Sequence, residues 1–328
     1  MRALLIVNPH ATSTTRLRRD VIARALASAV ELEIVETRYR GHGTSLASSA
    51  AEDGFGLVIT LGGDGTVNEA INGLLRRTPR PGYSAPSSGS PRGPADTGQE
   101  QAPPALAALP GGSANVFVRS LGLPPDPVDA TGQLLQALAA GRCRSIGVGL
   151  ADDRYFGFNS GMGLDAEVVR AVEGRRAHGR AVSPALYLRM AIRQFYRMTD
   201  RRHPAITLDG PAGEPGGPLL WCTVSNTAPW TYLGHRAVQT NPHASFDTGL
   251  DVFGLRRLGT IRTLVTLRQM LAQRDESPRG RGVVAQHDLP RLTLRASRPV
   301  AFQIDGEYVG EREQVTFRSV PGALRVVM

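Results

Sequence analysis

The feature that most constrains the fold is a glycine-rich segment between residues 57 and 75. The apolar run Leu57–Leu61 is typical of a buried strand, Gly62–Gly65 contains three glycines, and residues 66–75 show helical spacing. Such a turn offers backbone N–H groups and a helix start to a phosphate. Asp64 would repel a phosphate unless a cation lay between them, which favours a phosphate–Mg²⁺ site. A plain tight turn capped by Asp64 explains the glycines equally well.

The longer string Gly62–Gly73, GGDGTVNEAING, closely resembles the nucleotide-binding signature of the diacylglycerol kinase catalytic-domain family. This family includes sphingosine kinases and bacterial lipid kinases, and is more distantly related to NAD kinases and phosphofructokinases. The resemblance implies ATP and Mg²⁺ as cofactors, with Asp64 at the metal as a catalytic residue. The implied nucleotide-binding residues in this string are Gly62, Gly63, Asp64, Gly65, Thr66, Asn68 and Glu69.

Strand-like and helix-like segments alternate before the glycine turn. Strands are expected at 3–7, 32–35 and 57–61, and helices at 14–29 and after 41. This βαβ rhythm predicts a parallel sheet, whose ligands bind at the carboxyl ends of the strands. Asn8, Pro9, Thr12 and Thr37 follow two of these ends, and the resemblance implies that they contact the nucleotide. A strand-end hydroxyl without a ligand explains Thr37 equally well.

Residues 78–104 interrupt this pattern. The segment contains seven prolines, four glycines and four serines, with Tyr83 as its one aromatic residue. Such a composition buries too little apolar surface to offset the entropy of ordering. We therefore predict a disordered surface insertion inside the nucleotide domain.

A second glycine turn follows the strand-like run Ala105–Leu109. It reads Pro110–Asn115, PGGSAN, and Ser113 is the expected helix cap. The segment resembles the second nucleotide signature of the family, which implies that Ser113 and Asn115 bind ATP. Arg119 is retained, whereas Val116 replaces the usual aspartate. Two signatures in the family order favour nucleotide binding over an ordinary capped helix.

After residue 143 short runs alternate apolar and polar residues, which is typical of antiparallel strands. They are expected at 145–149, 155–159, 205–208, 219–225, 250–255, 291–296 and 300–304. We therefore predict a three-layer α/β nucleotide domain over 1–143, similar to NAD kinases and phosphofructokinases. An all-β sandwich that holds the lipid substrate is expected over 144–328, with its last strands packed back on the first domain.

Three later motifs carry acidic residues. The strand-like segment 302–307 ends in Asp-Gly-Glu. A hairpin turn is enough to explain this pattern. The resemblance implies in addition that Asp305 is the proton acceptor and that Glu307 supports the metal. Segment 241–251 resembles the metal motif of the family, which makes Asp247 a metal ligand, although Thr248 replaces the second acid. In a third motif, NSGMGLDA, we interpret Asp165 as a helix cap.

Charge and the remaining sequence features concern partners. The net charge of +9 suggests an anionic partner, although an Arg-rich genome explains it as well. Arg189, Arg193 and Arg197 share one face of a helix expected from Ser183, which predicts contact with anionic lipid or simply a solvated face. No stacking platform for nucleic acid is present. Without a signal peptide or an 18-residue apolar stretch, we expect a cytoplasmic protein that contacts the membrane peripherally. The sequence leaves the oligomeric state open, a homodimer included.

The resemblance and the motifs together predict an ATP-dependent lipid kinase. Its expected reaction phosphorylates the primary hydroxyl of diacylglycerol and gives phosphatidic acid. Another lipid alcohol, such as a sphingoid base or a glycolipid, is the alternative within this class. A non-catalytic nucleotide- or lipid-binding regulator would fit the departures at Val116 and Thr248. A soluble NAD kinase shares the glycine turn but fits the Asp-Gly-Glu ending poorly.

Overall fold

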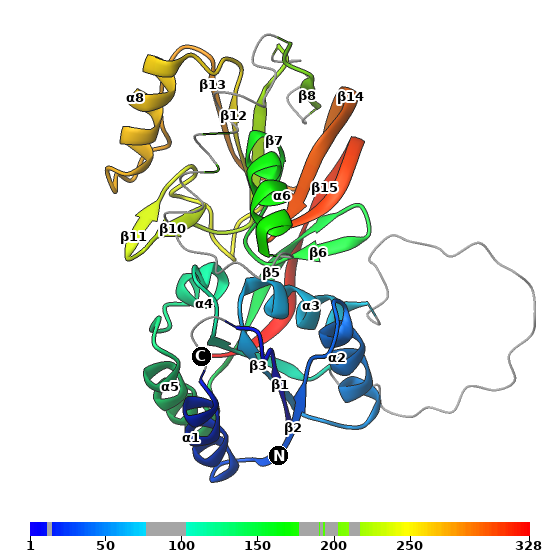
Figure 1. Ribbon diagram of the computed structural model, residues 1–328. Coiled ribbons are helices and arrows are strands. Elements are labelled where there is room, and N and C mark those ends of the chain that lie inside the picture. The colour runs from blue at the N-terminus through cyan, green and yellow to red at the C-terminus, as the bar shows by residue number, and fades with distance from the viewer. Residues whose placement is uncertain (12–14, 77–102, 177–189, 191–192, 194–202, 210–216) are drawn as a thin grey trace, which may run out of the picture.

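The computed structural model describes most of the chain (Figure 1). The described residues are 1–11, 15–76, 103–176, 190, 193, 203–209 and 217–328. Three expectations therefore fall outside them: the nucleotide contact of Thr12, the disorder of the insertion over 78–102, and the basic helix from Ser183 apart from positions 190 and 193.

The N-terminal half contains a parallel sheet in the order β4-β3-β1-β2. Its strands are β1 (Arg2–Val7), β2 (Glu31–Glu36), β3 (Leu57–Gly62) and β4 (Ala105–Pro110). The helices of this half are α1 (Arg16–Ala27), α2 (His42–Glu52), α3 (Asp64–Leu75), α4 (Val116–Ser120) and α5 (Pro127–Ala139). Strands and helices alternate as the sequence pattern predicts.

Helices cover both faces of this sheet. Leu4 and Ile6 of β1 belong to one buried cluster, which also contains apolar residues of α2 and α3. Leu5 and Val7 of the same strand belong to a second cluster, with residues of α1 and α5. Successive side chains of a strand point to opposite faces, so a strand that is apolar throughout supports a helical layer on each side. The three-layer α/β fold is thus confirmed.

The C-terminal half is rich in antiparallel strands, as predicted. It contains β5 (Cys143–Ala151), β6 (Arg154–Phe156), β7 (Asn159–Gly163), β8 (Ile206–Asp209), β9 (Trp221–Ser225), β10 (Thr231–Leu233), β11 (Arg236–Val238), β12 (Leu250–Leu255), β13 (Val283–Leu289), β14 (Arg291–Ile304) and β15 (Glu307–Val327). Two helices, α6 (Leu164–Arg176) and α8 (Thr260–Met270), accompany them. The two runs expected at 291–296 and 300–304 form one strand, β14, with an irregular register between them.

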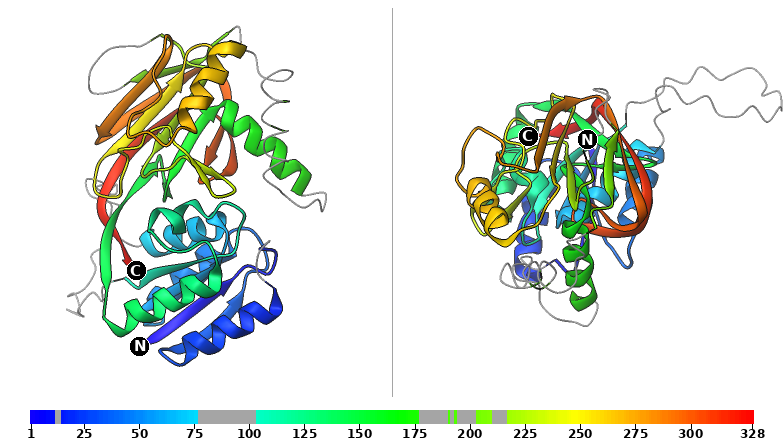
Figure 2. Two further views of the ribbon diagram at one scale, coloured as in Figure 1. Left: turned by 90° about the vertical axis from the view of Figure 1, so that its left-hand side faces the viewer. Right: turned by 90° about the horizontal axis from the view of Figure 1, so that it is seen from above.

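The long last strand connects the two halves. β15 pairs with β14 near its start, and near its end Val326 lies beside Leu106 of β4 in parallel register. In the left view of Figure 2 this red strand runs from the β-rich half down into the α/β half. The turn between β14 and β15, which carries Asp305, therefore belongs to a sheet that is continuous with the parallel strands of the N-terminal half.

Candidate active site

The two glycine turns lie against each other at the carboxyl ends of β3 and β4. The Gly111 amide donates a 2.7 Å hydrogen bond to the Gly62 carbonyl. A Cβ atom on Gly112 would lie 2.7 Å from the Cα atom of Gly63, too close for any side chain. The glycines are therefore required because two backbones touch, and their contact brings two loops of backbone N–H groups to one place.

Most residues predicted to bind the nucleotide line one cavity beside these loops. They are Asn8, Thr37, Gly63, Asp64, Gly65, Thr66, Glu69 and Ser113. The Asn8 side-chain amide donates to the Thr66 hydroxyl at 3.3 Å, which joins the end of β1 to the first turn of α3. Ser113 is not the helix cap that we expected, because Asn115 precedes the first residue of α4, with a positive φ of 49°.

Glu69 and Asn115, both predicted to bind the nucleotide, use their side chains to hold the protein backbone. The Glu69 carboxylate accepts hydrogen bonds from the amides of Gly41 (2.6 Å) and Gly43 (2.9 Å), at the start of α2. Asn115 bonds both the amide and the carbonyl of Gly112. Asn68 and Asn115 are buried and do not line the cavity. Pro9 and Gly62 do not line it either. In this structure Asn68 and Asn115 therefore support the residues that line the site and do not face the cavity themselves.

Asp64 links the first glycine turn to the second. Its carboxylate accepts a 3.1 Å hydrogen bond from the Phe117 amide in the first turn of α4. Loss of water around this partly buried group raises its pKa to about 6, although hydrogen bonds from the amides of Val116 and Phe117 oppose the shift. The negative charge of Asp305 raises the pKa further. Asp64 is thus anchored to the start of α4, and its raised pKa still lies below neutral pH.

Asp305 occupies a hairpin turn and also faces the cavity, so the two interpretations of its motif are compatible. Its φ of 47° and the φ of 75° at Gly306 are typical of the tight turn between antiparallel strands. Four N–H groups donate to its buried carboxylate. They are the Asn68 side chain (2.8 Å) and the amides of Gly157 (2.7 Å), Phe158 (3.0 Å) and Asn159 (3.2 Å). Burial outweighs these donors and raises the pKa of Asp305 to about 6.

Glu307 is held by two arginines that the sequence analysis did not identify. Arg154 donates to its carboxylate at 2.6 Å and to the Asn68 side-chain oxygen, also at 2.6 Å. Arg40, from the loop before α2, reaches the same Glu307 oxygen at 3.3 Å. The pair Arg40–Glu307 therefore joins the two halves of the chain at the cavity. No local motif marks either arginine, since each contact depends on how β6 and β15 pack against α2 and α3.

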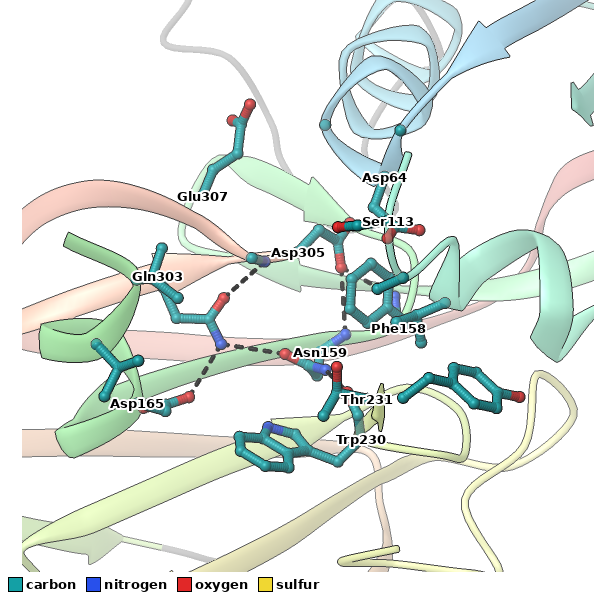
Figure 3. Close-up of a pocket in the computed structure, with 18 of the residues that line it drawn as sticks. Asp64, Ser113, Phe158, Asn159, Asp165, Trp230, Thr231, Gln303, Asp305 and Glu307 are labelled. Atoms are coloured by element: carbon teal, nitrogen blue, oxygen red, sulfur yellow. Dashed lines mark hydrogen bonds between the residues drawn. The ribbon is translucent and has the colours of Figure 1, made fainter. Parts of the chain in front are cut away.

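A chain of buried polar groups continues from Asp305 (Figure 3). The Gln303 amide nitrogen donates to Asn159 at 3.0 Å and to Asp165 at 3.1 Å. Desolvation raises the pKa of Asp165 to about 7 despite this hydrogen bond. We interpreted Asp165 as a helix cap alone; it does accept the Ala166 amide in the first turn of α6, but it also lines the cavity and bonds Gln303.

The cavity has a volume of about 680 Å³ and two chemically different ends. The glycine turns form one end, and Asp64, Asp305 and Glu307 lie next to it. The other end is apolar and lies between α6, α8 and the strands of the β-rich half. Its lining includes Leu164, Val168, Val169, Trp221, Val238, Leu255, Leu264, Leu267 and Met270. A molecule with a phosphate-accepting polar head and an aliphatic tail would match both ends.

The two residues expected to hold metal do not lie together in this cavity. Glu307 lines it, whereas Asp247 is exposed, forms an ion pair with Arg144 and is absent from the lining. Thr248, at the position of the second acid, bonds the Ser245 backbone through its hydroxyl. Among the residues that the structure describes, no three acids, histidines or cysteines are grouped as a metal cage. A metal at Asp247 that also reaches Glu307 does not follow from this arrangement.

Comparison with known proteins agrees with the resemblance of the motifs. Residues 2–150, which include both glycine turns and Thr37, match the model of the diacylglycerol kinase catalytic domain. This region belongs to the diacylglycerol kinase catalytic-domain family. The chain is accordingly an enzyme of the lipid kinase class, as predicted. Asp165, Asp305 and Glu307 lie outside the matched residues and enter the site through the fold.

Relatives and solved structures extend the similarity to the rest of the chain. A probable YegS-like lipid kinase of Chromohalobacter salexigens is 26% identical over 324 residues, which cover 98% of this chain and 91% of the relative. A diacylglycerol kinase of Bacillus subtilis is 30% identical over 160 residues, but these cover only 47% and 43% of the two chains. The crystal structure of a candidate diacylglycerol kinase of Bacillus anthracis superimposes with a TM-score of 0.74, at 20% identity and over 99% and 96% of the two chains, which shows the shared fold.

Proposed function

We propose that this enzyme transfers the terminal phosphoryl group of ATP to the primary hydroxyl of a lipid alcohol, with diacylglycerol as the first candidate. The observation that carries the proposal is the continuity of the cavity. Two glycine turns suit a polyphosphate, Asp64 and Asp305 lie beside them, and an apolar wall continues from the carboxylates. A nucleotide and an amphipathic lipid would meet at these carboxylates.

In the proposed complex the glycine turns bind the phosphates of ATP. Gly63, Gly65 and Gly112 expose backbone at the cavity, and Ser113 adds a hydroxyl. Mg²⁺ in kinases uses one or two carboxylates together with phosphate oxygens and waters, so the donor set suits it without a three-acid cage. Asp64 and Glu307 would hold the ion. When bound, Mg²⁺ neutralises phosphate charge, which is the main requirement of phosphoryl transfer.

Asp305 is the proposed proton acceptor for the lipid hydroxyl. A pKa of about 6 leaves it ionised at neutral pH yet basic enough to take a proton. All four of its hydrogen bonds stabilise one rotamer, and the bond from the Asn159 amide, at 3.2 Å, is the longest and the easiest to displace. The hydroxyl proton passes to a carboxylate oxygen of Asp305 while the hydroxyl oxygen bonds the terminal phosphorus of ATP. The bond from that phosphorus to the bridging oxygen breaks, and ADP leaves with the electron pair.

The apolar end would hold the acyl chains, and the buried polar chain would receive the lipid head. Asp165 and Gln303 lie between Asp305 and the apolar wall, next to Val168 and Val169. With a pKa of about 7, Asp165 is protonated in part at neutral pH and can then donate a hydrogen bond to an ester or hydroxyl oxygen. This arrangement favours an uncharged lipid alcohol near the site.

The test is incubation with radiolabelled ATP, Mg²⁺ and a panel of lipid alcohols, with NAD as a separate acceptor, read by the identity of the labelled product. We expect labelled phosphatidic acid from diacylglycerol, formed at a rate lower by about 10²-fold or more with the Asp305→Asn variant. Label on sphingosine or on a glycolipid alone would move the substrate to another lipid alcohol. Label on NAD would assign the enzyme to NAD kinases. Nucleotide binding without any labelled product would favour a regulator.

A further inference from the structure

Helix α8 exposes apolar side chains on the outside of the β-rich half, where Figure 1 shows it at the edge of the molecule. Ile261, Leu264 and Val265 are 79%, 59% and 51% exposed. Their spacing places them on one face of the helix, since positions three and four apart are neighbours. Three large apolar side chains grouped on one exposed helix face mark an interaction surface more often than chance exposure does.

This face is continuous with the apolar end of the cavity. Leu264 is both exposed and part of the cavity lining, and Leu267 of the same helix lines the cavity as well. Leu233, at the tip of the β10–β11 hairpin, is also exposed and lines the cavity. Arg236 of that hairpin donates to the Leu271 carbonyl at the end of α8, which holds the two elements together. The mouth of the apolar end thus opens beside the exposed face.

The charged residues on α8 and on its flanks up to residue 274 are all basic, and Asp275 and Glu276 follow directly after them. The stretch from Arg256 to Arg274 contains five arginines and no acidic residue. Arg257, Arg262 and Arg268 are exposed. Arg268 lies one and two turns after Leu264 and Ile261, so its aliphatic stem extends the apolar face while its guanidinium can reach outward. A face that is apolar at its centre and basic at its rim matches the interface of an anionic lipid bilayer.

We propose that α8 docks the enzyme on an anionic membrane, with Ile261 and Val265 inserted among the lipid chains and the arginines on the headgroups. None of the helices in the described parts of the chain is long and apolar enough to cross a membrane. A second copy fits this face poorly, because a two-fold interface would bring two sets of arginines together. On this surface a lipid could enter the apolar end of the cavity beneath α8. That entry route rests on the proposed function, whereas the docking surface itself does not.

The test uses the full chain and sedimentation with vesicles that contain neither substrate nor ATP. The vesicles are phosphatidylcholine alone or phosphatidylcholine mixed with phosphatidylglycerol. We expect binding to the anionic vesicles, weakened about tenfold by the double variant Ile261→Gln, Val265→Gln, because two inserted apolar side chains are lost. The variant Arg262→Gln, Arg268→Gln should lose most of the preference for anionic vesicles, also on the order of tenfold. Neither pair includes a cavity-lining residue.

The matched control is Leu17→Gln with Val21→Gln on α1. These two side chains are 75% and 48% exposed and four residues apart, but lie in the α/β half. The control should bind vesicles as the wild type does. All variants should keep the melting temperature of the wild type. The arginine variant tests the proposal even if the apolar one misfolds.

Equal vesicle binding by the wild type and both α8 variants would overturn the proposal. So would a wild-type dimer in lipid-free solution that Ile261→Gln, Val265→Gln converts to a monomer, because a second copy would then cover the face. Absence of vesicle binding alongside normal kinase activity would reject the docking surface alone. Vesicle binding without phosphorylation of any lipid would reject only the proposed function.

Discussion

Asp64 and Asp305, from the two halves of the chain, face one cavity, and the negative charge of Asp305 raises the pKa of Asp64. Asp64 is bonded to the start of α4, and Asp305 to the backbone between β6 and β7. Because both carboxylates are held by backbone N–H groups, a shift of one half against the other would change the gap between them. Such fixed geometry is what positioning a phosphoryl group requires.

Replacing the proposed proton acceptor should stop transfer without preventing nucleotide binding. In Asp305→Asn an NH₂ group meets N–H donors, so we also expect a loss of about 1–3 kcal/mol in the free energy of unfolding. Turnover should fall by about 10²-fold or more, as measured with labelled ATP, while ATP affinity stays within a few-fold. Asp209→Asn, an exposed acid on β8 paired with Arg295, is the control. Near-wild-type turnover of Asp305→Asn would reject the base assignment.

The acid limb of activity should follow Asp305 and Asp64. Both have pKa values raised to about 6 and must be ionised for their proposed roles, so turnover should rise with pH through this value. The side chain of Asn68 donates to Asp305 and lowers its pKa. Asn68→Ala should therefore move the acid limb to higher pH. Asn72→Ala removes a neighbouring buried amide that has no bond to Asp305, and its pH profile should stay in place.

The stability of the protein should decrease as pH rises from about 4 to about 8. Burial raises the pKa of Asp165 from its ordinary value of 3.8 to about 7. Between these values the folded state binds more protons than the unfolded state, so stabilisation present at low pH is lost through the folded pKa. At about 1.4 kcal/mol per pKa unit, this group contributes on the order of 4 kcal/mol to the change. Chemical denaturation should show a shallower pH dependence for Asp165→Asn; an identical slope would contradict the buried acid.

The contact between the glycine turns should tolerate no side chain. Gly112→Ala would push against the Cα atom of Gly63, so we expect ATP affinity to fall by about tenfold or more as the loops separate. Gly132→Ala on α5 has nothing within 4 Å of the added carbon and should be slightly stabilising. Titration calorimetry with ATP and Mg²⁺ measures the ATP affinity of both variants. If Gly112→Ala bound ATP like Gly132→Ala, the glycine turns would not form the nucleotide site.

The parts of this site that the sequence predicts correctly depend on local patterns. The turn at Gly62–Gly65 combines strand, glycines and helix within a short stretch, and the alternating strands and helices predict its place at the end of a parallel sheet. The turn at Asp305 is recognisable because Asp-Gly in a strand context marks a turn, whereas its role as proton acceptor rests on the resemblance of the motif and stays a prediction. Such features need no knowledge of distant contacts.

The parts that were missed depend on packing between distant segments. Arg154 lies 86 residues from Asn68 and 153 from Glu307, so no window of sequence reveals that it bonds both. A motif also identifies a residue without indicating which group its side chain bonds. Glu69 lies in a nucleotide signature, yet its carboxylate holds the amides of Gly41 and Gly43. Asp165 was interpreted too narrowly, since its partner Gln303 comes from β14.

The most direct measurement is a crystal structure with a non-hydrolysable ATP analogue and Mg²⁺. We expect the phosphates to contact Gly63–Gly65 and Ser113, with the terminal phosphate between Asp64 and Asp305. A nucleotide bound elsewhere, or one whose terminal phosphate points away from Asp305, would contradict the proposed site.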